Sequence, residues 1–187
     1  TADFSGAFAA TIDYGTDGPG SVAYSLDLSA NGIGSGLYAL GAGGAQGAEI
    51  LLSQSGNIIT GSVGTTDYFT IEIDPSTGVV TFDQLNNVWH ADGTDDDDTS
   101  TLTLDGAGEH LRVVQTVTDA DGDSDSAFIE LGTGVFQIED DGPDAVVDPD
   151  ATPETLVLDE TRPVGTETDG DSDPAGLKTV TAAFADN

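Results

Sequence analysis

The sequence predicts an all-β protein, built as an antiparallel β-sandwich, and two observations lead to that prediction. Apolar and polar side chains alternate in short runs, which is the period of a half-buried strand, and no window of a dozen residues carries a helical stripe. Turn residues separate these runs at intervals of about 8 to 12 residues, the spacing found in sandwiches. At 37% hydrophobic residues, the chain can bury a core, which argues against disorder.

The alternating runs define the expected strands in chain order. They are Phe8–Tyr14, Val22–Leu28, Ile50–Ser53, Ile58–Thr60, Tyr68–Ile73, Val79–Phe82, Leu102–Leu104, Leu111–Val117 and Phe128–Leu131. Ser55–Asn57 and Asp74–Gly78 carry the turn residues of hairpins. The glycine-rich run Gly32–Gly44 is expected to be a long flexible loop, part of an irregular segment from Ala30 to Gly47.

The charge is the second informative feature. Thirty-five acidic residues against three basic ones give a net charge of −32. Clustered aspartates repel one another unless hard cations with oxygen ligands neutralise them, so we expect calcium to stabilise the fold. Adaptation to high salt is the alternative explanation. Nucleic acids and anionic membranes would be repelled, and both are excluded as partners.

Several absences narrow the class of protein further. The chain has no cysteine, hence no disulfide and no thiolate metal site, and no apolar stretch of transmembrane length. Two histidines and no nucleophile motif give no catalytic constellation, so we do not expect an enzyme. A disulfide-free domain that calcium stabilises suits an extracellular setting, where weak calcium sites are occupied.

The chain also contains an internal repeat. Thr181–Asn187 resembles the opening residues, with Thr181 over Thr1 and Phe184 over Phe4, which indicates a repeat of roughly 180 residues. Residues 1–142 are expected to form the sandwich and 143–155 an acidic, proline-rich linker. Residues 156–187 would then complete that fold or begin the next repeat.

Together, several motifs give a family resemblance. They are Tyr14–Gly20, Asp74–Val79, Val88–His90, Val117–Asp123, Phe136–Pro143 and Leu158–Glu160. In this order they resemble the large repeats of RTX adhesins, the type I-secreted surface proteins of Gram-negative bacteria. The resemblance implies an extracellular, calcium-dependent domain at the bacterial surface that acts in attachment and biofilm formation. Such a domain either binds a peptide or glycan of a host or neighbouring cell, or serves as a structural extender beside adjacent repeats.

Three groups of acidic residues are candidate calcium ligands. The first is Asp119, Asp121, Asp123 and Asp125, which have EF-hand spacing with Glu130 at position 12. Ser124 replaces the glycine of that loop and the flanks are strand-like, so we expect a calcium-binding hairpin or a solvated acidic turn. The second group, Asp95, Asp96, Asp97 and Asp98, is expected to share a site with the first or to form a solvated acidic face. The third, Glu139 with Asp140 and Asp141, is expected at the joint to the next repeat or in a plain linker.

A ligand site is expected beside the second acidic group. Trp89 is the only tryptophan and is followed by His90 and Asp92. An aromatic wall next to a calcium ion can hold a peptide or a sugar, while burial in the core is the other common place for a single tryptophan. The glycine-rich run Gly32–Gly44 would shape this pocket.

Overall fold

The computed structural model describes residues 1–8, 11–95, 97–143 and 145. The chain divides into two units, Thr1–Gly142 and Pro143–Asn187, and only the first contains described strands. The predicted linker and the strands expected in 156–187 lie outside the described residues, except for Pro143 and Ala145.

The first unit is all-β, as the sequence predicts. Its strands, all antiparallel to their neighbours, are β1 (Ala2–Asp3), β2 (Pro19–Leu28), β3 (Ile33–Leu40), β4 (Gln46–Ser55), β5 (Ile58–Val63), β6 (Thr66–Ile73), β7 (Val79–Gln84), β8 (Thr99–Thr103), β9 (Leu111–Asp119), β10 (Ser124–Glu130) and β11 (Thr133–Glu139). Two short 3₁₀ turns, η1 (Ser5–Ala7) and η2 (Ala42–Gly44), are the only helical segments among the described residues. None of the helical turns described has the length or apolar character needed to cross a membrane.

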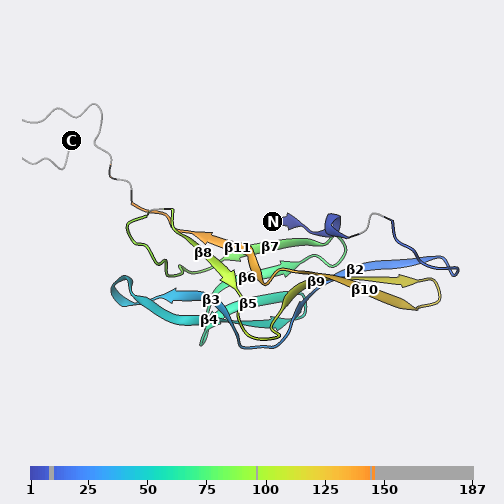
Figure 1. The fold of residues 1–187 in the computed structure, drawn as a ribbon, viewed down its shortest axis with the longest axis horizontal. Helices are drawn as coiled ribbons and strands as arrows, with labels where there is room; N and C mark the ends of the chain where they lie inside the picture. Colours follow the sequence, from blue (N-terminus) through green and yellow to red (C-terminus); the bar gives the residue numbers. More distant parts are fainter. Residues whose placement is uncertain (9–10, 96, 144, 146–187) are drawn as a thin grey trace, which may run out of the picture. The chain divides into compact units, whose positions relative to one another are not determined.

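The strands form three sheets (Figure 1). The largest has the order β1-β7-β6-β5-β4-β3, a second has the order β10-β9-β2, and β11 pairs with β8. Residues that alternate along β2 and β9, such as Tyr24, Leu26, Leu111 and Val113, enter one continuous core with the inner face of the large sheet. This sandwich-like packing hides a set of apolar side chains large enough to drive folding.

Two predictions about local structure are wrong. Thr11–Tyr14 are not in a strand, whereas the glycine-rich run forms strand β3 followed by η2 rather than a flexible loop. Inward positions of β3 alternate through Ile33, Ser35, Leu37 and Ala39, so the strand period is present but two of its four members are small or polar. Buried Ser35 satisfies its hydroxyl by donating a 2.6 Å hydrogen bond to the Ile50 carbonyl.

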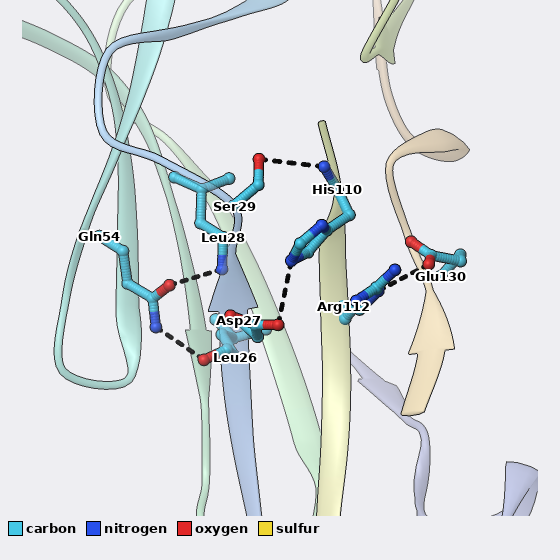
Figure 2. A network of polar contacts seen from close by, with 8 residues as sticks. All are labelled: Leu26, Asp27, Leu28, Ser29, Gln54, His110, Arg112 and Glu130. Carbon is cyan, nitrogen blue, oxygen red and sulfur yellow. Dashed lines mark hydrogen bonds and ion pairs between the residues drawn. The ribbon is translucent and has the colours of Figure 1, made fainter. Parts of the chain in front are cut away.

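Side chains connect β2 to β4 of the large sheet and to the residue before β9 in its own sheet (Figure 2). The Gln54 side chain of β4 accepts a hydrogen bond from the Leu28 amide and donates one to the Leu26 carbonyl, each 2.7 Å long. On the other side, His110 Nε2 lies 3.1 Å from Asp27 Oδ2. Strand β2 is therefore held against β4 by a side-chain amide rather than by a backbone ladder.

Strands β10 and β11 form a continuous ribbon that runs from one end of the first unit to the other. Strands β10 and β11 follow each other through Leu131 and Gly132, pairing first with β9 and then with β8. One end of this ribbon is the β9–β10 turn, and the other is the start of β8 beside the end of β11 (Figure 1). At about 3.3 Å per extended residue, the chain from Ser124 to Glu139 spans on the order of 50 Å.

Candidate functional site

The β9–β10 turn holds the strongest candidate for a metal site. Carboxylate oxygens of Asp17, Asp119 and Asp121 all lie within 4.8 Å of one another. Asp119 is the last residue of β9, Asp121 lies in the turn, and Asp17 precedes β2. We refer to these three residues as the Asp17 cluster. Two segments about a hundred residues apart thus contribute to one site.

The pairing of β2 with β9 brings the cluster together. Pro19 pairs with Asp119, and the Ala120 amide donates a 3.1 Å hydrogen bond to the Gly18 carbonyl. A bulge follows Pro19, and a Cβ at Gly20 would collide with the backbone of Thr118 and Asp119. Glycine at position 20 is therefore required for the close approach that places Asp17 over the turn.

Hydrogen bonds within the turn fix the Asp119 carboxylate. Its Oδ1 accepts bonds of 2.9 and 2.8 Å from the amides of Gly122 and Asp123. The pKa of Asp119 lies below its ordinary value, mainly because of a side-chain hydrogen bond with Asp121; desolvation opposes this lowering, and the amide bonds each add a smaller contribution to it. The two amide bonds fix the position of the Asp119 carboxylate in the turn.

The spacing of the cluster fits a hard cation. Two oxygens that each lie about 2.4 Å from one ion are at most about 4.8 Å apart, and the three carboxylates stay within that limit. Three unit charges with few protein donors repel one another, and a divalent ion would reverse that repulsion. The arrangement can hold a metal ion, with all the oxygen donors that calcium prefers.

The five acidic residues with EF-hand spacing do not form one site. Asp119 and Asp121 belong to the cluster, whereas Asp123 and Asp125 line a neighbouring groove of about 380 Å³ together with Asp13 and Tyr14. Glu130 lies at the far end of the hairpin, where it accepts a 2.6 Å hydrogen bond from Arg112 Nε. The flanks are strands, so this segment is a hairpin and not an EF-hand.

The expectation that Asp95, Asp97 and Asp98 share a site with the β9–β10 turn is wrong. These residues lie at the opposite end of the ribbon, where the Asp140 amide donates a 2.9 Å hydrogen bond to the Asp98 carbonyl. Asp98 Oδ2 accepts from the Asp92 amide, and Asp95 Oδ1 accepts from the Asp97 amide. The carboxylates of Asp95 and Asp98 therefore accept hydrogen bonds within their own loop, and Asp96 lies outside the described residues.

The second and third acidic groups meet instead, through the hydrogen bond from the Asp140 amide to the Asp98 carbonyl. Glu139, Asp140 and Asp141 line a pocket of about 380 Å³ with Trp89 and His90. We call this the Trp89 pocket. Trp89 is half-buried, packs edge-on against Tyr38 at 6.4 Å, and has its amide bonded to the Tyr38 carbonyl.

Of the other two residues predicted to bind a ligand, His90 lines the Trp89 pocket and Asp92 does not. His90 Nδ1 lies 3.2 Å from the Ser100 hydroxyl, while Leu40 and Gly44 bring the end of the glycine-rich run to the pocket wall. Asp92 does not line the pocket; its Oδ1 accepts bonds from the amide and hydroxyl of Thr94, which lower its pKa.

Asp17 is the residue that reading the sequence missed. It stands in the motif Tyr14–Gly20, whose Asp-Gly-Pro-Gly turn immediately precedes a strand. That turn is the sequence signal that marks Asp17. Only the pairing of β2 with β9 shows that Asp17 lies beside Asp119 and can share a metal ion with it.

Comparison with known proteins gives one finding. Residues 1–132 match the family described as a domain of unknown function, DUF5801. No curated protein and no solved structure matched the chain. Because the match covers well over half of the sequence and all of the strands that form the Asp17 cluster, the chain belongs to the DUF5801 family of domains.

Proposed function

We propose that this domain is a calcium-stabilised module of a bacterial RTX-type adhesin, displayed outside the cell and acting in attachment to other surfaces. The observation that carries the proposal is the convergence of Asp17, Asp119 and Asp121 on one point. The resemblance of the ordered motifs to RTX adhesin repeats supplies the biological setting. The net charge of −32 agrees with a protein that works where calcium is abundant.

A calcium ion at the Asp17 cluster would stabilise the fold. It would tie the loop before β2 to the β9–β10 turn, to which the bond from Ala120 to Gly18 and the strand ladder already connect it. The Trp89 pocket lies at the other end of the ribbon, so an ion at the Asp17 cluster cannot contact a ligand bound there. Calcium and ligand are therefore separate in this proposal.

The Trp89 pocket supports adhesion rather than a purely structural role. A half-exposed tryptophan beside His90 and three carboxyl groups offers a stacking surface with hydrogen-bond acceptors, which suits a glycan or a peptide carrying basic groups. An extender repeat, which only spaces neighbouring domains, is the second candidate. The separation of the Asp17 cluster from the Trp89 pocket favours the extender role, because an ion at the cluster would stiffen the domain without taking part in ligand binding.

Two measurements test the proposal. A thermal melt with 5 mM calcium and with chelator tests the ion, and an unchanged melting temperature would contradict the calcium claim. A screen of glycans and short basic peptides, using the calcium-loaded protein and its Trp89→Ala variant, tests the pocket. Saturable binding that the variant loses supports adhesion, and the absence of binding supports the extender.

A further inference from the structure

Among the described residues, no strand fills the groove between β7 and β11. The groove has a volume of about 450 Å³ and is lined by Phe82 of β7, by Val135 and Phe136 of β11, and by Thr1 and Ala2 at the start of the chain. Val135 is 42% exposed although it lies beside the core residue Phe136. We call this groove the β7–β11 seam.

The backbone edges along the seam are open. On its outer side β7 pairs with β1 only at Val79 and Val80, so Thr81–Gln84 have no ladder partner there among the described residues. Strand β11 pairs with β8 along one edge, and the structure describes no strand on the other. Open edges beside exposed apolar side chains are sites for adding a strand.

The register of β1 predicts what would fill the seam. Ala2 pairs with Val80 and Asp3 with Val79, so the next pair outward is Thr1 with Thr81. A residue placed before Thr1 would then pair with Phe82, the one before it with Asp83, and the one before that with Gln84. A short upstream extension of β1 would therefore run along the whole open edge of β7.

The internal repeat supplies the sequence of that extension. With Thr181 over Thr1, Val180 takes the position opposite Phe82, Thr179 the position opposite Asp83, and Lys178 the position opposite Gln84. Directly opposed residues of antiparallel strands share a face. The valine would thus cover the Phe82 ring on the core side, and the threonine would face outward beside an exposed aspartate.

The position of the one lysine also supports this pairing of the added segment with β7. Lys178 is the only lysine of the chain. Opposite Gln84 it would lie at the end of the seam where Glu139 lines the groove and where Gln84 and Glu139 meet Asp140 and Asp141 in the Trp89 pocket. One cation of the segment is thus placed against a local group of carboxylates.

We propose that the β7–β11 seam is a docking site for the segment Leu177–Val180 of a preceding copy of this sequence, which extends β1 and closes the sandwich. The last residues of one repeat would then be the first strand of the next. Successive repeats would be joined by one continuous strand, without a slack connection. The inference does not depend on calcium or on any ligand.

An extended protein tests this directly. Gly176–Val180 are added in front of Thr1 of the full chain, and a matched control carries the same extension with proline in place of its valine. Since proline cannot donate to the ladder and removes the apolar side chain over Phe82, only the unmodified extension should raise the melting temperature, by about 3 °C or more. Equal melting temperatures for the two extensions would overturn the proposal.

Disulfide trapping tests the register. The chain has no cysteine, so one cysteine in the extension, at the position of Thr179, and one from Asp83→Cys are the only thiols present. Their Cα atoms would lie about 5 Å apart, within disulfide range, whereas a cysteine moved to the lysine position would point to the other face. Rapid oxidation in the first pair only is the expected result, and equal or absent oxidation in both would contradict the register.

A final variant distinguishes the source of the strand. If the chain's own C-terminal segment filled its own seam, Val180→Asp in the unextended protein would lower the melting temperature at every protein concentration. That result would overturn the assignment to a preceding copy. An unchanged melting temperature for this variant, combined with stabilisation by the upstream extension, supports it.

Discussion

The Gln54 side chain substitutes for a missing strand ladder beside Leu28. Its Oε1 accepts the Leu28 amide proton at 2.7 Å, while its Nε2 donates to the carbonyls of Leu26 and Gly56. Leu26 and Leu28 are buried, so their backbone groups at this edge depend on one side chain from another sheet. This amide joins the β10-β9-β2 sheet to the large sheet.

Gln54→Ala is therefore expected to lower the free energy of unfolding by about 2 kcal/mol, because it leaves an amide and a carbonyl of β2 without partners. Urea denaturation measures the change. Gln46→Ala, at an exposed position of the same strand, is the control and should change stability by less than about 0.5 kcal/mol. Equal effects of the two substitutions would contradict the role of Gln54.

Gly61→Ala tests the packing of the Phe69 ring over Gly61 in the core. Gly61 pairs with Phe69 across the β5–β6 ladder, and the ring lies where a Cβ would be. We expect overpacking to cost about 1 to 3 kcal/mol, measured by denaturation. Gly93→Ala, where a Cβ meets no atom within 4 Å, is the control. In a Phe69→Leu background the cost of Gly61→Ala should shrink, and full additivity would argue against the contact.

Asp17→Asn tests the membership of the Asp17 cluster. If Asp17 is a calcium ligand, the calcium concentration that gives half of the maximal rise in melting temperature should increase by about tenfold or more. Asp105→Asn changes the same charge at an exposed position outside the cluster and should leave that concentration unchanged. A calcium titration followed by thermal melts decides, and identical curves for the two variants would remove Asp17 from the site.

The Asp74 turn predicts a specific dependence on pH. Its Oδ1 accepts hydrogen bonds from the hydroxyl and amide of Ser76, and these lower the pKa of Asp74 below its ordinary value of 3.8. Because the folded pKa is depressed, the stabilisation is present above pH 3.8 and is lost as the pH falls through the folded pKa.

Asp74→Ala should therefore lower the melting temperature at neutral pH, with a difference from wild type that narrows below about pH 4. Asp67→Ala, an exposed carboxylate in the same sheet, controls for the general relief of negative charge on acidification. A constant difference for Asp74→Ala from pH 7 to pH 3 would contradict this origin of the stabilisation.

Strands whose alternation is strongly apolar could be predicted from sequence. Val22–Leu28, Tyr68–Ile73 and Leu111–Val117 all lie within observed strands, because a half-buried strand imposes a period of two that needs no knowledge of its neighbours. Strand β3 was missed because Ser35 and Ala39 occupy inward positions, and only the neighbouring strand shows that small side chains are needed there.

The sequence by itself determined the fold class, the acidic character and the β9–β10 hairpin, since local periodicity, composition and turn residues decide these. The tertiary structure decided which aspartates meet. Asp17 lies beside Asp119 because β2 pairs with β9, and Asp98 lies beside Asp140 because β8 pairs with β11. Pairing between strands distant in sequence depends on how all the strands share one core, and no local pattern carries that information.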